Sequence, residues 1–163
     1  MLIDISYFTK GSRRIANVTE TPIKPESVAA NKQVEVYIDE YEGQFLVKAL
    51  GEVKAAEIDA YIEDEAHEPR EDFDAIIEKL KEPCADYVFY HFLKYANTEV
   101  TPVGTVSLKG SNTYMSAARL MTCIWNEMVE KMRTFRDWMY ENHCGEGYVI
   151  YGSITTKITE SWI

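Results

Sequence analysis

Histidine and cysteine are the side chains of this sequence best suited to catalysis or metal binding. There are three of each, and only His143 and Cys144 are adjacent. A cysteine nucleophile needs a histidine to activate it and a third group to orient that histidine, but neighbours along a chain rarely face each other. A tetrahedral zinc site needs a second close pair of ligands. We therefore interpret the pair as a polar helix terminus, with a small enzyme that uses both residues as an alternative.

The other candidate groups have ordinary structural interpretations. His91 lies among aromatic residues, as expected of a core histidine, and His67 lies in the most acidic part of the chain, as expected of a solvated loop residue. Between Glu52 and Glu82 there are twelve acids and four bases, so carboxylate pairs occur without marking a glycosidase acid and base. The residue pattern predicts no enzyme activity, no cofactor and no metal site.

The same acidic stretch dominates the charge of the chain. Net charge is −10, and −8 of it falls between Glu52 and Glu82. Such a surface repels a phosphate backbone and gives no electrostatic footprint for DNA binding. It is interpreted either as a solvated face that keeps the protein soluble or as a surface that faces a partner or a channel. Six carboxylates define this predicted acidic surface: Glu63, Asp64, Glu65, Glu68, Glu71 and Asp72.

One long helix, over about 113–142, organises the expected fold. Large apolar residues recur there at alternating steps of four and three, which places them in one stripe on a helix. Asn112 is a candidate N-cap, and Gly145 lies just past the expected end. The stripe consists of Met121, Trp125, Met128, Met132, Phe135 and Met139.

The rest of the chain supplies shorter elements that cover this stripe. Helical spacing predicts a helix over 25–50 that Gly51 ends, a weaker helix over 52–65 and a short helix over 73–80 that ends before Pro83. An aromatic-rich helix over 83–97 follows. Alternating residues predict a hairpin or loop over 98–110 and strands over 148–163. The sequence thus predicts a mainly α helical bundle with a small β element, in a single domain over 1–163 that begins with an extended arm over 1–24.

Apolar content and the order of charges at the start of the sequence indicate the expected compartment of the protein. No apolar run approaches the roughly 18 residues that span a bilayer. The first residues place an acid before the basic side chains, the reverse of a secretory signal, so a cytoplasmic protein without membrane contact is expected. The odd number of cysteines argues against a disulfide framework.

Several short segments resemble the head–tail connector (adaptor) proteins of tailed bacteriophages and prophages. They occur in order over about 130 residues, and none contains a catalytic motif. They are Ile3-Asp4-Ile5-Ser6-Tyr7-Phe8, Val36-Tyr37-Ile38-Asp39-Glu40-Tyr41-Glu42, Phe45-Leu46, Ala49-Leu50-Gly51, Tyr90-His91-Phe92-Leu93-Lys94-Tyr95, Thr101-Pro102-Val103-Gly104 and Ile124-Trp125-Asn126-Glu127-Met128-Val129.

This resemblance implies a structural subunit that assembles as a ring below the portal, extends the DNA channel and contacts the portal and tail-completion proteins. DNA would pass through without specific binding, and the protein would lie in the host cytoplasm during assembly and then in the virion. Arg13, Arg14, Val103 and Val106 are the expected subunit-interface residues. Reversing both arginine charges is expected to weaken assembly and to leave thermal stability nearly unchanged. The alternative is a cytoplasmic acidic module that binds or regulates another protein.

Overall fold

The computed structural model describes residues 1–64, 68–96, 98–101, 104–107, 116–143 and 146–162, and the side chains of 96, 98–101 and 104–107 are not described. The mainly α prediction is confirmed. Among the described residues there are four α-helices: α1 (Pro25–Leu50), α2 (Glu52–Glu63), α3 (Glu71–Ala96) and α4 (Ala117–Asn142). Short 3₁₀ turns occur near both ends of the chain, η1 (Ile5–Phe8), η2 (Gly11–Arg13), η3 (Gly152–Ile154) and η4 (Glu160–Trp162).

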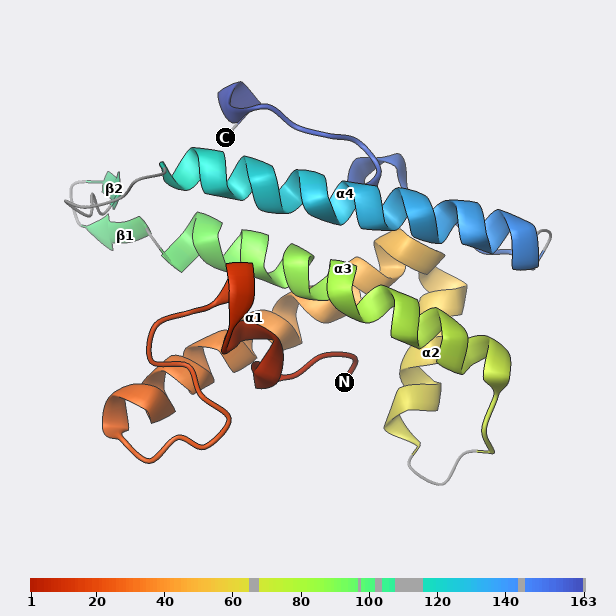
Figure 1. The fold of residues 1–163 in the computed structure, drawn as a ribbon, viewed down its shortest axis with the longest axis horizontal. Coiled ribbons are helices and arrows are strands. Elements are labelled where there is room, and N and C mark those ends of the chain that lie inside the picture. Colours follow the sequence, from red (N-terminus) through yellow and green to blue (C-terminus); the bar gives the residue numbers. More distant parts are fainter. Residues whose placement is uncertain (65–67, 97, 102–103, 108–115, 144–145, 163) are drawn as a thin grey trace.

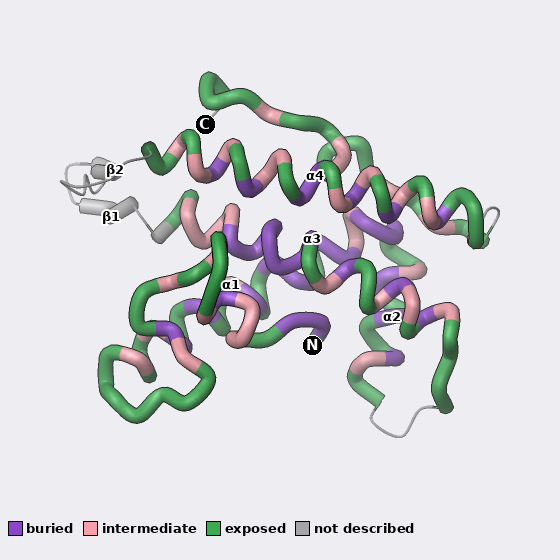
Figure 2. Tube along the Cα trace, viewed as in Figure 1, coloured by how far each residue is buried: buried purple, intermediate pink, exposed green. Residues whose placement is uncertain are grey.

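Helix α3 is the central element of the fold. It packs against α4 on one side and against α1 on the other (Figure 1). Its middle turns, over 83–89, are continuously buried (Figure 2). Apolar side chains of α3 therefore contribute to both helix interfaces, and the core forms one connected cluster.

The apolar stripe of α4 is confirmed. Five of its six residues are buried, and Trp125 is half-buried against Tyr87 and Tyr90 of α3. The helix begins at Ala117 because the Ser116 side chain accepts a hydrogen bond from the Arg119 N–H. The predicted cap Asn112, residues 113–115 and Gly145 lie outside the described residues.

The predicted break at Pro83 is wrong. Residues 71–96 form one helix, with Pro83 buried inside it. Proline removes one backbone hydrogen bond and costs about 3 kcal/mol in a helix interior. The helix continues because its buried face runs without interruption on both sides of the proline, so two separate helices would lose that packing. The buried residues of this face include Phe73, Ile76, Leu80, Cys84 and Tyr87.

Both ends of the first long helix follow the sequence. Pro25 occupies the first turn of α1, where its missing N–H has no partner to lose. Gly51 ends the helix with φ of +81°, a conformation that residues with a Cβ rarely adopt. The chain then turns directly into α2, so the side chains of α1 and α2 pack at this corner.

The N-terminal segment folds onto its own chain. Leu2, Ile3 and Phe8 are buried in the core. The carboxylate of Glu42, buried on α1, accepts hydrogen bonds from the N–H groups of Leu2 at 2.8 Å and Ile3 at 3.1 Å. The predicted extended arm over 1–24 thus contains two 3₁₀ turns and is attached to the helical body.

The strands predicted over 148–163 are wrong. Residues 148–162 contain only η3 and η4, and their backbone pairs with helices instead of with a strand. The N–H groups of Val149 and Tyr151 donate to carbonyls at the C-terminal end of α1, at 3.1 and 2.8 Å. The segment with these alternating residues lies across α4 (Figure 1). It forms no strand because carbonyls at the end of a helix lack partners within the helix, and its N–H groups bond to them.

Two short strands connect α3 to α4. β1 (Thr98–Thr101) pairs antiparallel with β2 (Gly104–Ser107), with Thr98 opposite Ser107 and Thr101 opposite Gly104. The pair projects beyond the ends of α3 and α4 (Figure 1). Val103 and the predicted hairpin residues 108–110 lie outside the described residues, and the side chain of Val106 is not described.

Gly51 and Gly43 provide a matched test of this architecture. A Cβ on Gly51 would lie 3.1 Å from the Val149 Cβ and would hold a positive φ, whereas a Cβ on helical Gly43 meets nothing within 4 Å. We expect Gly51→Ala to lower the free energy of unfolding by about 2 kcal/mol. Gly43→Ala should raise it by roughly 0.5–1 kcal/mol. Urea unfolding followed by circular dichroism measures both, and equal effects would contradict the described turn.

Candidate interaction surface

A cluster of four charged side chains, called the charge node below, joins three segments of the chain. Asp86 of α3 is only 1% exposed, and its carboxylate accepts from Arg13 Nη1 at 2.6 Å and Lys131 Nζ at 2.5 Å. Glu82 lies one turn earlier on the same face of α3 and accepts from Arg13 Nη2 at 2.7 Å. The node (Arg13, Glu82, Asp86 and Lys131) therefore fastens the N-terminal segment and α4 to α3.

The electrostatics of the node favour the charged forms of Arg13 and Glu82. Desolvation opposes the charge on Arg13, but the hydrogen bonds that it donates to Glu82 and Asp86 outweigh desolvation and raise the pKa of the guanidinium. Burial likewise works against the Glu82 carboxylate, yet Arg13 and Lys131 hold its pKa below the usual value. A buried carboxylate with two cationic partners is stable, and loss of one partner is costly. Arg13, predicted at a subunit interface, thus has its charge paired within its own chain.

Aromatic rings surround His91 where α1 meets α3. The imidazole stacks on Tyr41 with a centroid distance of 4.0 Å and an interplanar angle of 11°. Tyr87 and Tyr90 approach it at 4.6 and 5.3 Å. Lys48 Nζ donates to the Tyr87 hydroxyl at 2.5 Å. Stacking of this kind packs α1 against α3. The interpretation of His91 as a core histidine holds only in part, because the residue is half-buried between the two helices.

This environment strongly disfavours a charged imidazole. Burial, followed by the charges of Lys48 and Lys94, lowers the pKa of His91 from 6.5 to about 4. Nδ1 of His91 is buried and makes no hydrogen bond with the described residues. Burial also raises the pKa of Tyr41, with further contributions from Glu40. His91 and Tyr41 therefore stay neutral at physiological pH.

The other histidine and cysteine residues that the structure describes do not come together in one site. His143 Nδ1 lies 3.0 Å from a Glu146 carboxylate oxygen, while its sequence neighbour Cys144 and the loop residue His67 lie outside the described residues. Cys84 is fully buried, which raises its thiol pKa, and Cys123 is exposed on α4. Within the described ranges, no group of three or more metal-ligating side chains comes together.

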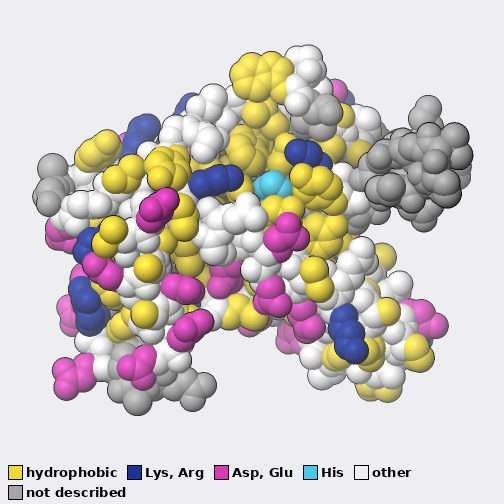
Figure 3. Space-filling model, turned by 180° about the vertical axis from the view of Figure 1, so that it is seen from behind, with side chains coloured by type: hydrophobic (Ala, Val, Ile, Leu, Met, Phe, Trp, Pro, Cys, Tyr) yellow, Lys and Arg dark blue, Asp and Glu magenta, His cyan; other side chains and the backbone are white. Residues whose placement is uncertain are grey.

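The described residues of the predicted acidic surface lie at the end of α2, between α2 and α3, and at the start of α3. Acidic side chains gather over this region (Figure 3). Asp72 differs from the others, because a hydrogen bond from Arg70 at 2.7 Å lowers the pKa of its half-buried carboxylate despite desolvation. Glu65 lies outside the described residues. The exposed members are Glu63, Asp64, Glu68 and Glu71.

Arg14 behaves differently from Arg13. It is exposed and lines a hollow of about 460 Å³ together with Lys10. Neither Lys10 nor Arg14 forms an ion pair with any residue that the structure describes. The two cations are therefore accessible on this surface, and the assignment of Arg14 to a subunit interface stays a prediction.

Sequence reasoning missed Asp86 and Lys131. Asp86 was visible only as one acid in a segment of aromatic residues, and Lys131 as one charge on the polar side of α4. The useful signal was the i,i+4 spacing of Glu82 and Asp86, which places both carboxylates on one face of a continuous helix. That signal was lost because a helix boundary was expected at Pro83.

Comparison with known proteins adds no relative. No family model, curated protein or solved structure matches this chain. Among the described helices, none is long and apolar enough to cross a membrane.

Arg13 and Arg14 test the charge node directly. Arg13→Ala removes one of two cations from buried Asp86 and should lower the free energy of unfolding by roughly 3 kcal/mol. Arg14→Ala, its exposed neighbour, should change it by less than about 0.5 kcal/mol. This replaces the expectation that reversing both charges leaves stability unchanged. Thermal and urea unfolding compare the two, and a wild-type stability for Arg13→Ala would contradict the node.

His91 should make stability depend on pH. Above pH 6.5 the imidazole is neutral in both the folded and the unfolded chain. Between pH 6.5 and about 4 the unfolded chain takes up a proton that the folded chain excludes, so stability falls as pH falls through this window.

His91→Phe keeps the ring stack and removes this proton. We expect urea unfolding at several pH values to give a flatter dependence over pH 4.5–6.5 for His91→Phe than for wild type. Tyr95→Phe, which alters a neighbouring ring and keeps the imidazole, serves as the matched control. The same slope in His91→Phe and wild type would rule out His91 as its source.

Proposed function

We propose that this protein is a structural subunit of a phage or prophage head–tail junction, which assembles as a ring below the portal and extends the DNA channel. Its partners would be further copies of itself and the portal and tail-completion proteins. It would act without catalysis, in the host cytoplasm during assembly and then in the virion. The sequence resemblance motivates this proposal, and the position of the β1–β2 pair is the structural observation that supports it best.

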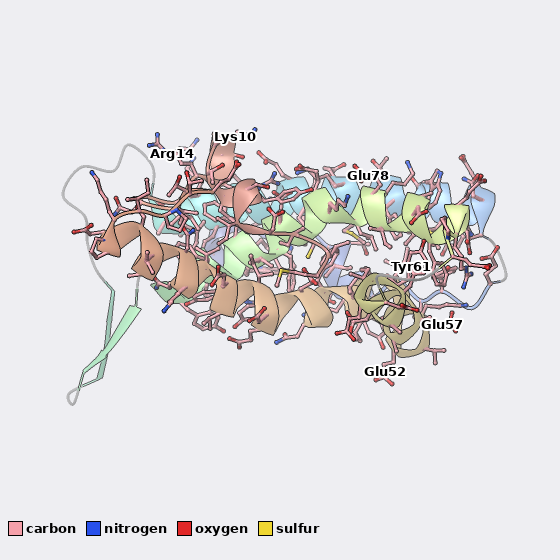
Figure 4. All side chains as sticks on the ribbon, turned by 90° about the horizontal axis from the view of Figure 1, so that it is seen from below. Lys10, Arg14, Glu52, Glu57, Tyr61 and Glu78 are labelled. Atoms are coloured by element: carbon pink, nitrogen blue, oxygen red, sulfur yellow. The ribbon has the colours of Figure 1, made fainter. Side chains whose placement is uncertain are left out.

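The β1–β2 pair is placed to contact another protein. Its sheet has two strands, and each therefore has an outer edge without a strand partner among the described residues. An isolated two-stranded hairpin is marginally stable in water, and an open edge pairs readily with another chain. The pair projects away from the helical body (Figure 4). A neighbouring subunit that covers this edge would stabilise the hairpin and link the two copies.

The net charge of the chain supports the proposal that DNA passes through a channel formed by the ring. A duplex moves through a channel most easily when the wall holds none of its phosphates. Protein–DNA affinity depends largely on cationic side chains that neutralise phosphates. A chain with net charge −10 supplies an excess of carboxylates instead, so a ring of such chains would repel the backbone along its length.

A second candidate function is a cytoplasmic acidic module that binds or regulates another protein. The exposed carboxylates of α2 favour it, since they form a negative surface that would attract a basic partner. Such a module would be a monomer or dimer and would bind in a salt-sensitive way. Oligomeric state therefore separates the two proposals.

Native mass spectrometry and negative-stain microscopy over a range of protein concentrations provide the main test. We expect wild type to form a closed ring of many copies. Replacing residues 98–110 by a Gly/Ser linker of equal length should abolish the ring, because the projecting strands are removed, and should leave the melting temperature nearly unchanged.

The control for this experiment is Glu35→Ala, an exposed change on α1 that should leave assembly intact. A ring in the linker variant would contradict the role of β1 and β2. A wild-type protein that stays monomeric at every concentration would contradict self-driven assembly and would favour the acidic binding module.

A further inference from the structure

Two exposed bases of the N-terminal segment and two exposed acids of α2 lie on opposite edges of the molecule, although exposed Glu78 of α3 lies on the same edge as the bases (Figure 4). Lys10 and Arg14 lie along one edge, and Glu52 and Glu57 lie along the other (Figure 4). Residues 1–24 carry four bases and two acids, whereas residues 52–82 carry four bases and twelve acids. Lys10 and Arg14 thus lie apart from Glu52 and Glu57 within one copy of the chain, whereas Arg13 of the same N-terminal segment pairs with Glu82.

The positive surface is a groove formed by the N-terminal segment. We call it the basic groove, and it is lined by Thr9, Lys10, Gly11, Arg14, Ile15, Asn17, Val18, Thr19 and Ser27. Its shape is held by hydrogen bonds within the segment and to α1. The Ile15 N–H donates to the Phe8 carbonyl at 3.0 Å, and the Asn31 side chain bonds both the N–H and the carbonyl of Thr19.

A fixed backbone leaves the basic groove preformed, with two exposed cations at its surface. Lys10 and Arg14 have no carboxylate partner within the described residues, in contrast to Arg13 between them, which the charge node holds. A preformed site with unpaired cations binds an anionic surface at a low cost in conformational entropy.

The negative surface is a ridge along the outer side of α2. Glu52, Ala56, Asp59 and Glu63 recur at steps of four, three and four, and all are exposed; we call them the acidic ridge. Glu57 has Lys54 as a partner at 2.8 Å, but Glu52, Asp59 and Glu63 form no ion pair within the described part of the chain. Because the Ala56 side chain is small, a partner can approach the helix closely between Glu52 and Asp59.

We propose that the basic groove of one copy receives the acidic ridge of the next copy. Because the two surfaces lie on opposite edges, the contact is head-to-tail, with different surfaces used on each partner. Head-to-tail contacts build rings when the rotation between copies closes and open filaments when it does not. The inference rests on the proposed function for its closure into a ring, and it identifies a second pair of surfaces that joins the copies beside the β1–β2 pair.

The proposed contact between the basic groove and the acidic ridge depends on exposed charges, so its affinity falls as the salt concentration rises. Exposed charges are screened over about 8 Å at physiological ionic strength and over about 3 Å at 1 M. Raising the salt concentration therefore dissociates the assembly, whereas an interface made of apolar side chains strengthens or stays constant. The same contact aligns the copies during encounter, because complementary patches steer association.

Charge reversal of each surface tests the contact. Lys10→Glu with Arg14→Glu makes the groove acidic, and Glu52→Lys with Asp59→Lys makes the ridge basic. Each double variant alone presents like charges at every contact, and we expect its assembly to need about tenfold more protein than wild type. An equal mixture restores opposite charges at every contact, so assembly should return with the two variants alternating. A chain that carries all four changes should assemble alone.

Lys32→Glu with Arg119→Glu is the matched control, because it makes the same change in net charge at exposed residues outside the groove. Native mass spectrometry identifies mixed assemblies by the masses of the two variants, and circular dichroism confirms that each is folded. Unchanged assembly of either double variant, or no recovery in the mixture, overturns the inference even though wild-type rings would still support the proposed function. A wild type that forms no assembly at all overturns both.

Discussion

The fold depends on neutralising a carboxylate buried between helices. Asp86 lies on the central helix, almost without solvent, and an unpaired charge there would cost several kcal/mol. Arg13 reaches it from the N-terminal segment and Lys131 from α4. Because all three segments must be in place before the charge is satisfied, the node couples their folding. It also explains why an N-terminal segment rich in polar residues stays on the helical body.

A second buried carboxylate follows the same logic at the start of the chain. Glu42 on α1 has its pKa raised by burial, an effect that hydrogen bonds from Leu2 and Ile3 reduce. The segment is thus tied at Leu2 and Ile3 to α1 and at Arg13 to α3, and the residues between and after these ties form the basic groove. The backbone of the basic groove is therefore positioned by the hydrogen bonds and ion pairs that Glu42 and Asp86 accept. Arg13 is paired within the structure, whereas Arg14 beside it is exposed and forms no ion pair with the described residues.

Much of the helical architecture could be predicted from local sequence. The stripe from Met121 to Met139, the proline at the start of α1 and the glycine at its end are each short-range signals with a direct physical cause. The exposed carboxylates of α2 were also predictable, since charged side chains at helical spacing without apolar partners remain in water. The two main errors came from applying local rules where packing decides. Pro83 breaks an isolated helix, but α3 is held on both sides by other helices. Alternation over 148–163 is typical of a strand, but the segment finds its backbone partners at the end of α1.

The sequence by itself determined α1, α2 and the apolar stripe of α4, together with the separation of charge between the N-terminal segment and the region from Glu52 to Glu82. These are properties of residue type and spacing along a few turns. Only the tertiary structure decided which of two adjacent arginines is paired, that Asp86 needs two cations from distant segments, and that the basic groove and the acidic ridge lie on opposite edges. Those outcomes depend on residues up to 73 positions apart and on which charges lose their water, and the free energy of burial is fixed only when the helices have packed.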